Sequence, residues 1–147
     1  MTDYKFDLFV IGGGSGGVRA ARVASSYGLK VGLAEGWDLG GTCVNRGCVP
    51  KKLYSYASHI RDDFDLMDSF GWSITKKKFS WKKLVNNKKK ELSRLSSIYS
   101  SLLINSGVKV YKSYASFVDT NSIKIGNKII NAKKFLIAVG TKPKKLN

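Results

Sequence analysis

Both cysteines of the chain lie in one short segment, GGTCVNRGCVPKK. Four residues separate Cys43 from Cys48, and Arg46, Lys51 and Lys52 lie beside them. Thiols near cations and near the start of a helix are expected to have lowered pKa values, which favours the reactive thiolate. The segment therefore predicts redox chemistry or metal binding rather than a structural crosslink.

A disulfide between these cysteines places a condition on the backbone. Residues five positions apart in a regular helix are about 7.5 Å apart along its axis, whereas a disulfide needs Cα atoms within about 6.8 Å. Cys43 must then lie in an irregular lead-in, with Cys48 in or just before the first turn of a helix. The neighbouring glycines allow such a bend, and Pro50 is tolerated in a first turn.

Zinc binding and thioredoxin-like chemistry fit the cysteine segment less well. Zinc usually takes four ligands, and the single histidine, His59, is the only further candidate, so we expect no metal. A thioredoxin-like site would have two intervening residues instead of four. Two inert buried thiols remain an alternative, although they would not explain the glycines and lysines around them. We interpret His59 as a surface or packing residue.

A second chemical motif lies about thirty residues upstream, where Gly12, Gly14 and Gly17 stand in G-x-G-x-x-G register. Such glycines permit a tight turn, close approach of a pyrophosphate and packing of a helix on a strand. Free N–H groups at the helix N-terminus would face the anion, and Ser15 adds a hydroxyl donor. Glu35 could accept ribose hydroxyls and would repel a 2′-phosphate, which predicts FAD or NAD rather than NADP.

The elements that position these motifs follow from the hydrophobic pattern. Residues 5–11 and 30–35 are strand-like, and the helix-compatible stretch 18–27 lies between them, which predicts a right-handed β–α–β unit with parallel strands. The cysteine segment leads into a helix over roughly residues 48–66. Apolar residues at helical spacing predict a longer helix from residue 81 to about 105. The fold class is therefore α/β.

Five short strand-like segments complete the chain, with Asn and Gly at the turns. They read VKVY, YASFVD, SIKIG, KIIN and FLIAVG. The net charge of +16 favours anionic partners, whether nucleic acid, lipid headgroups or small phosphorylated or carboxylated molecules. Neither a secretory signal nor a membrane-length apolar stretch is visible, so we expect a cytoplasmic protein that does not bind membranes.

The two motifs together resemble the N-terminal FAD domain of the pyridine nucleotide–disulfide oxidoreductases, and among them the glutathione reductases. The resemblance runs from about residue 4 to 143. Lipoamide dehydrogenases typically carry Ile-Pro-Ser-Lys where this chain has Val49-Pro50-Lys51-Lys52. The Val18–Arg22 run and Ala138-Val139-Gly140 are similar to plant-type and some bacterial glutathione reductases. Glu91 departs from the pattern, because a family tyrosine stands there.

The resemblance implies a Rossmann-like FAD-binding domain with a parallel sheet and a small antiparallel β-meander. It also implies that residues 1–147 are the N-terminal part of this domain. The NADPH domain and the interface domain, which supplies a His–Glu pair to the partner subunit in a homodimer, would be absent. We therefore expect this chain to be a fragment that does not reduce glutathione disulfide by itself.

The resemblance also implies roles for individual residues. Cys43 would be the interchange thiol that attacks glutathione disulfide, Cys48 the thiol nearest the flavin, and Lys51 the cation near the reactive edge of the flavin. The residues implied in cofactor binding are Gly12, Gly14, Ser15, Gly16, Gly17, Glu35, Thr42, Cys43, Lys51 and Ala115. The residues implied in substrate binding are Ser15, Arg19, Arg22 and Tyr99.

The function implied is reduction of glutathione disulfide by NADPH through FAD and a redox-active disulfide between Cys43 and Cys48. One alternative is a sibling flavoprotein that resembles lipoamide dehydrogenase or mercuric reductase. An alternative of another class is a basic nucleic-acid-binding module. We disfavour it, because the lysines alternate with the apolar stripe as on a solvated helix face and no recognition motif appears.

Overall fold

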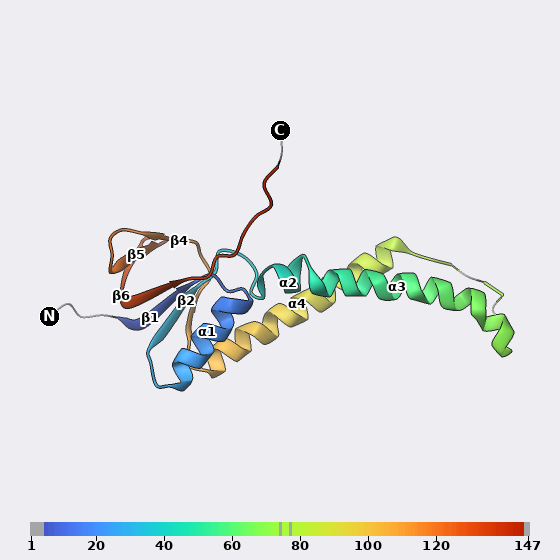
Figure 1. Cartoon of the computed structure of the whole chain (residues 1–147), viewed down its shortest axis with the longest axis horizontal. Coiled ribbons are helices and arrows are strands. Elements are labelled where there is room, and N and C mark those ends of the chain that lie inside the picture. Colours follow the sequence, from blue (N-terminus) through green and yellow to red (C-terminus); the bar gives the residue numbers. More distant parts are fainter. Residues whose placement is uncertain (1–4, 74, 77, 146–147) are drawn as a thin grey trace.

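A six-stranded sheet in the order β3-β2-β1-β6-β5-β4 forms the centre of the fold (Figure 1). The computed structural model describes residues 5–73, 75–76 and 78–145. The strands, in chain order, are β1 (Phe6–Ile11), β2 (Val31–Ala34), β3 (Lys109–Tyr111), β4 (Ala115–Phe117), β5 (Ser122–Ile125) and β6 (Lys128–Ile137). β3, β2, β1 and β6 are parallel, while β5 and β4 extend the sheet in antiparallel fashion. The predicted α/β class, with a parallel sheet and an antiparallel meander, is confirmed.

The first β–α–β unit forms as predicted. β1 pairs in parallel with β2, with Leu8 opposite Val31, and helix α1 (Ser15–Ser26) connects them. The helix starts three residues earlier than expected, because the glycine turn after β1 leads straight into it. Gly28, with a φ of +81°, follows the end of the helix, and its N–H donates to the Ser25 carbonyl at 2.9 Å.

The prediction of two separate strands, KIIN and FLIAVG, is wrong. KIIN and the first three residues of FLIAVG belong to one strand, β6, which has ten residues and ends at Ile137. Its first part pairs antiparallel with β5, and its second part pairs in parallel with β1, beginning where Ala132 lies opposite Phe6. Asn131 suggested a turn, but it lies within β6, because hydrogen bonds to β5 on one side and to β1 on the other hold this strand extended.

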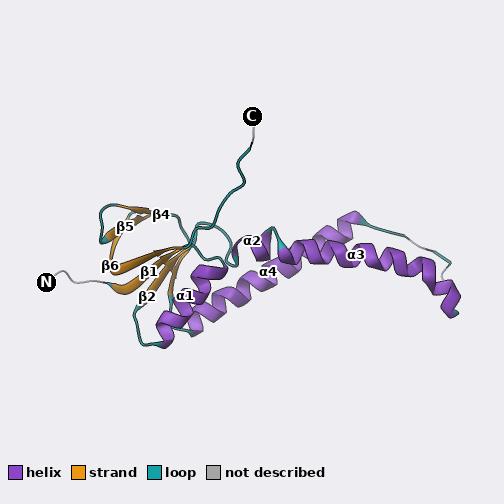
Figure 2. Cartoon of the chain, viewed as in Figure 1, coloured by secondary structure: helices purple, strands orange, loops and turns teal. Residues whose placement is uncertain are grey.

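Two long helices extend away from the sheet (Figure 2). After the short α2 (Gly41–Asn45) come α3 (Cys48–Leu66) and a 3-10 turn, η1 (Met67–Phe70), and α4 (Trp81–Asn105) returns to the sheet. α3 and α4 have the predicted bounds. Ser80 caps α4 by accepting a hydrogen bond from the Lys83 N–H, and the stacked rings of Tyr54 and Trp81, 5.5 Å apart, join the two helices.

The apolar core has one cluster on each face of the sheet. One cluster packs α1 and the C-terminal part of α4 onto the sheet, with Val10, Leu33 and Leu103 fully buried. The other lies under the β4–β5 hairpin around Phe9 and Ile123. This packing leaves the carboxyl ends of β1 and β2 free to carry a site. None of the described helices has the length and apolar character needed to cross a membrane.

Candidate functional site

The two sequence motifs meet at the carboxyl end of the parallel strands. The glycine turn follows β1, Glu35 follows β2, and α2, which carries the first cysteine, begins beside the glycine turn. Figure 1 shows β1, β2, α1 and α2 meeting at this end of the sheet. In parallel α/β sheets this edge is the usual place for ligands, because the loops there surround a helix N-terminus. The geometry of three segments therefore defines the candidate site.

The glycine turn is tightly packed on its inner side. Gly12 has a φ of +109°, and a Cβ there would lie 2.3 Å from the Ala138 carbonyl oxygen. A Cβ on Gly17 would lie 1.9 Å from the Gly12 carbonyl oxygen. Both positions therefore exclude any side chain, which agrees with the structural roles predicted for the first and third glycines.

The outer side of the same turn is open. A Cβ on Gly16 would meet no described atom within 4 Å, and one on Gly14 would come no closer than 3.7 Å to the Gly41 Cα. Gly14 is the N-cap of α1 and supplies no side-chain acceptor, and the first turn holds no acidic residue. The N–H groups at this end of α1 suit an anion such as a diphosphate, with exposed Ser15 beside it.

Glu35 holds the turn in place. One carboxylate oxygen, Oε2, accepts a hydrogen bond from the Gly13 N–H at 2.7 Å, and Oε1 accepts one from the Trp37 N–H at 2.8 Å. The position after β2 is as predicted, but the sequence suggested only a contact to ribose. A carboxylate has about four acceptor positions, so both backbone bonds leave capacity for ribose hydroxyls.

The cysteine segment packs directly on the glycine turn. The Gly40 N–H donates to the Gly13 carbonyl at 2.9 Å. A Cβ on Gly41 would lie 2.7 Å from the Gly14 Cα, so the two backbones touch. The glycine pair before the first cysteine, which was expected only to bend the chain, therefore brings α2 against the glycine turn.

Cys43 and Cys48 lie on either side of a helix break. Cys43 is half-buried in α2, where a short helix replaces the expected irregular lead-in. Gly47, with φ −124° and ψ −109°, separates α2 from α3. Exposed Cys48 is the first residue of α3, as predicted, and both cysteines are free thiols in this structure. The break brings the two side chains together, which an unbroken helix would not do.

The predicted lowering of the Cys43 pKa is wrong. Its pKa is raised, first by the side-chain hydrogen bond with Cys48, and then by burial and by the charge of that thiol. Two of the three nearby cations lie against aromatic rings instead. The Arg46 Cζ lies 3.4 Å from the centroid of the Trp37 ring, and the Lys52 Nζ lies 5.5 Å from that of Tyr56.

The other predicted site residues are spread over neighbouring elements. Thr42 lies exposed in α2, and exposed Lys51 lies in the first turn of α3. Ala115 begins β4, where it pairs with Ile125 and packs against the core. These positions leave their proposed contacts with a cofactor as predictions.

The predicted substrate residues are on the two helices that cover one face of the sheet. Arg19 and Arg22 are exposed on α1, and the Arg22 Nε donates to the Ser106 Oγ at 3.4 Å. Tyr99 is half-buried on α4 and packs against the core. His59 is exposed on α3, in agreement with its interpretation as a surface residue.

Two residues that the sequence did not single out also shape the site. The Asn45 side-chain amide donates to the carbonyls of Asp38, Leu39 and Gly41, at 3.2, 3.3 and 3.1 Å, and thereby closes the loop before α2. Trp37 holds the side chain of Arg46. Both contacts join residues that only the folded chain brings together, so the sequence offered no direct signal for either.

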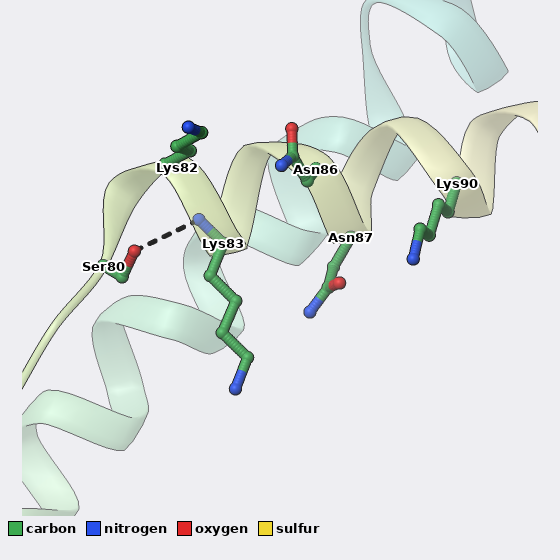
Figure 3. A pocket seen from close by; sticks show the side chains of 6 residues that line it. All are labelled: Ser80, Lys82, Lys83, Asn86, Asn87 and Lys90. Atoms are coloured by element: carbon green, nitrogen blue, oxygen red, sulfur yellow. Dashed lines mark hydrogen bonds between the residues drawn. The ribbon is translucent and has the colours of Figure 1, made fainter.

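A shallow hollow of about 330 Å³ lies elsewhere, at the start of α4 (Figure 3). It is lined by Ser80, Lys82, Lys83, Asn86, Asn87 and Lys90. The side chains of Lys82 and Lys83 point to opposite sides of the helix, so they do not converge on one ligand. This hollow is separate from the glycine turn and the cysteines.

Comparison with known proteins agrees with this geometry. The chain is 45% identical over 143 residues to a glutathione reductase of Burkholderia cepacia, covering 97% of this chain and 32% of the relative. It is 44% identical over 140 residues to a glutathione reductase of Nostoc sp., and this match covers 95% of this chain and 30% of the relative. It is 42% identical over 151 residues to the chloroplastic/mitochondrial glutathione reductase of Pisum sativum, and this match covers 95% of this chain and 27% of the relative.

The chain thus spans about a third of the length of the curated relatives it matches. The family described as pyridine nucleotide-disulphide oxidoreductase matches residues 6–147, which include the glycine turn, Glu35 and both cysteines. By this match over nearly its whole length, the chain belongs to the pyridine nucleotide-disulphide oxidoreductase family.

Proposed function

We propose that this chain is the N-terminal part of the FAD-binding domain of a flavoprotein that reduces glutathione disulfide with NADPH. The observation that supports the proposal is the backbone contact between Gly41 and Gly14, because it brings the two-cysteine segment against the glycine turn. The relatives named glutathione reductase, similar over nearly the whole chain, support the choice of substrate. The NADPH and interface domains, and a homodimer, would belong to the longer protein.

The described residues fit FAD. The open outer side of Gly14 and Gly16 leaves room for a diphosphate at the N-terminus of α1, and Glu35 has acceptor capacity for the ribose. Further proposed contacts come from Gly12, Ser15, Gly17, Thr42, Cys43, Lys51 and the backbone of Ala115. FAD, when bound, would supply two electrons taken from NADPH to open the bridge between the two cysteines.

The thiol chemistry then follows from the two cysteines. Opening their disulfide takes two electrons and two protons and yields two thiols. The Cys43 thiolate attacks one sulfur of glutathione disulfide, so that a mixed disulfide forms and the first glutathione leaves as a thiolate that takes up a proton. The Cys48 thiolate attacks the Cys43 sulfur, releases the second glutathione and restores the bridge. Cys48 raises the pKa of Cys43 through its side-chain hydrogen bond and its charge, so the two thiols are coupled in this exchange.

Cofactor binding can be tested on this chain directly. We expect FAD titrated into the purified chain to bind, and Glu35→Ala to weaken binding at least about tenfold, because the substitution removes the acceptor for the Gly13 N–H and for the ribose. The measurement is quenching of flavin fluorescence. Asp38→Ala, an exposed acid in the same turn, is the matched control and should bind FAD as the parent chain does. Equal affinity for the Glu35 variant, or no binding by a folded chain, would contradict the proposal.

Substrate choice depends on charge in the proposal. In a protein of the relatives' full length, Arg19→Glu with Arg22→Glu is expected to raise KM for glutathione disulfide at least about tenfold, because two cations facing an anionic substrate become anions. Steady-state kinetics gives KM and kcat separately. Lys124→Glu with Lys128→Glu makes the same change in net charge on the β5–β6 hairpin and should leave KM unchanged. An unchanged KM in the arginine variant would favour a reductase for another disulfide or for mercuric ion.

A further inference from the structure

Trp37 and Arg46 form a contact that burial does not force. The Arg46 Cζ lies 3.4 Å from the centroid of the Trp37 ring, although 63% of Trp37 is exposed. A guanidinium over an indole face is held by the electrostatic attraction between the cation and the ring. Trp37 belongs to the turn after β2, and Arg46 caps the end of α2. The contact therefore joins two loops that carry different parts of the site.

The stacked pair is the last step in a continuous series of contacts. The Gly13 N–H of the phosphate-binding turn donates to Glu35, and the Trp37 N–H donates to the other oxygen of the same carboxylate. The Trp37 ring then holds Arg46, whose own N–H donates to the Thr42 carbonyl at 2.9 Å. The series links the glycine turn to Arg46, one of the four residues between the two cysteines.

The position of Arg46 matters because it lies between the two cysteines in the sequence, close to each of them along the chain. It lies three residues after Cys43 and two before Cys48. A cation within about 4–6 Å of a thiol lowers its pKa and increases the thiolate fraction. In this structure the guanidinium lies on Trp37, and the causes of the Cys43 pKa shift are Cys48 and burial, with no contribution from Arg46.

The remaining charged groups around the pair have identifiable positions. α3 contributes Lys51 and Lys52, the second of which lies over Tyr56. α4, which contacts α2 and α3, carries Glu91 and Arg94, and these pair with each other at 2.7 Å. The turn after β2 contributes Glu35, which is bound to backbone N–H groups, and the exposed Asp38. Arg46 is the cation that lies between the two cysteines in the sequence and whose guanidinium is held by one ring, that of Trp37.

We propose that Trp37 is a positioning residue for the cysteine pair, holding the Arg46 guanidinium away from the thiols and thereby setting their reactivity. The inference deepens the proposed function, since it concerns the same two cysteines. Its test needs neither flavin nor turnover. Failure of FAD binding would therefore leave it standing, and its own failure would leave the proposed function standing.

The experiment measures alkylation of the reduced 147-residue chain by iodoacetamide across pH, with each cysteine followed by mass spectrometry. In Trp37→Ala the freed Arg46 should lower the midpoint of the pH–rate profile for alkylation by about one pH unit. At a pH below both midpoints, alkylation should then be roughly tenfold faster than in the parent chain. Arg46→Ala alone should keep the midpoint of the parent chain. Trp37→Ala with Arg46→Ala should return to that midpoint, a pattern that a purely structural role would not produce.

Matched variants separate the ring from the fold. Trp37→Phe retains an aromatic face and should behave as the parent chain does. Trp72→Ala removes another exposed tryptophan, beyond η1, and should also have no effect. Trp37→Leu keeps bulk without a π face and replaces the alanine variant if that one does not fold. The proposal is overturned if the alanine and leucine variants keep the parent profile, or if the double variant keeps the shift.

Discussion

Gly17→Ala is expected to destabilise the chain by about 3 kcal/mol and to abolish FAD binding. The added Cβ would lie 1.9 Å from the Gly12 carbonyl oxygen and 3.2 Å from the Val10 Cγ1. The obstacle at 1.9 Å is backbone and not the end of a flexible side chain, so the whole turn after β1 must move. Urea denaturation followed by circular dichroism gives the free energy of unfolding, and flavin fluorescence gives FAD affinity.

Gly16→Ala is the matched control for this prediction. It lies next to Gly17 in the same helix, but a Cβ there meets no described atom within 4 Å. Alanine in a helix is about 0.5–1 kcal/mol more favourable than glycine, so the unliganded chain should become more stable. FAD affinity should fall, because the methyl group enters the space proposed for the diphosphate. A Gly17 variant within about 1 kcal/mol of the parent would contradict the packing argument.

Cys48→Ser in a protein of the relatives' full length is expected to lower turnover of glutathione disulfide by a factor of about 10³ or more. A serine hydroxyl cannot attack the mixed disulfide between Cys43 and glutathione, so Cys43 should remain joined to one glutathione. Mass spectrometry of the intact protein would detect this adduct, and steady-state assays would give the loss of turnover.

Cys43→Ser provides the comparison. It should lose turnover to a similar extent but carry no glutathione, because the interchange thiol itself is missing. The structure makes this comparison informative, since Cys48 is the more exposed of the two thiols and Cys43 is half-buried. Glutathione found on Cys48 in the Cys43 variant, and none in the Cys48 variant, would reverse the two proposed roles.

The parts of the fold predicted best are those whose signals are local. α3 and α4 have their predicted bounds, because Pro50 marks a first turn and Ser80 caps α4 through its own side chain. β6 was predicted poorly for the opposite reason. Its ten residues hold together through β1 on one side and β5 on the other, and the sequence around Asn131 does not show which strands will pair there.

The sequence by itself determined the family, the order of the elements and the residues of the two motifs, because each depends on residue types at short spacing. Only the tertiary structure decided how the motifs meet. It placed Gly41 against Gly14, engaged both oxygens of Glu35 with backbone N–H groups, and stacked Arg46 on Trp37. The tertiary structure also decided the direction of the Cys43 pKa shift. The pKa of a thiol depends on the charges, hydrogen bonds and burial around it in space, whereas the sequence shows only which cations are near it along the chain.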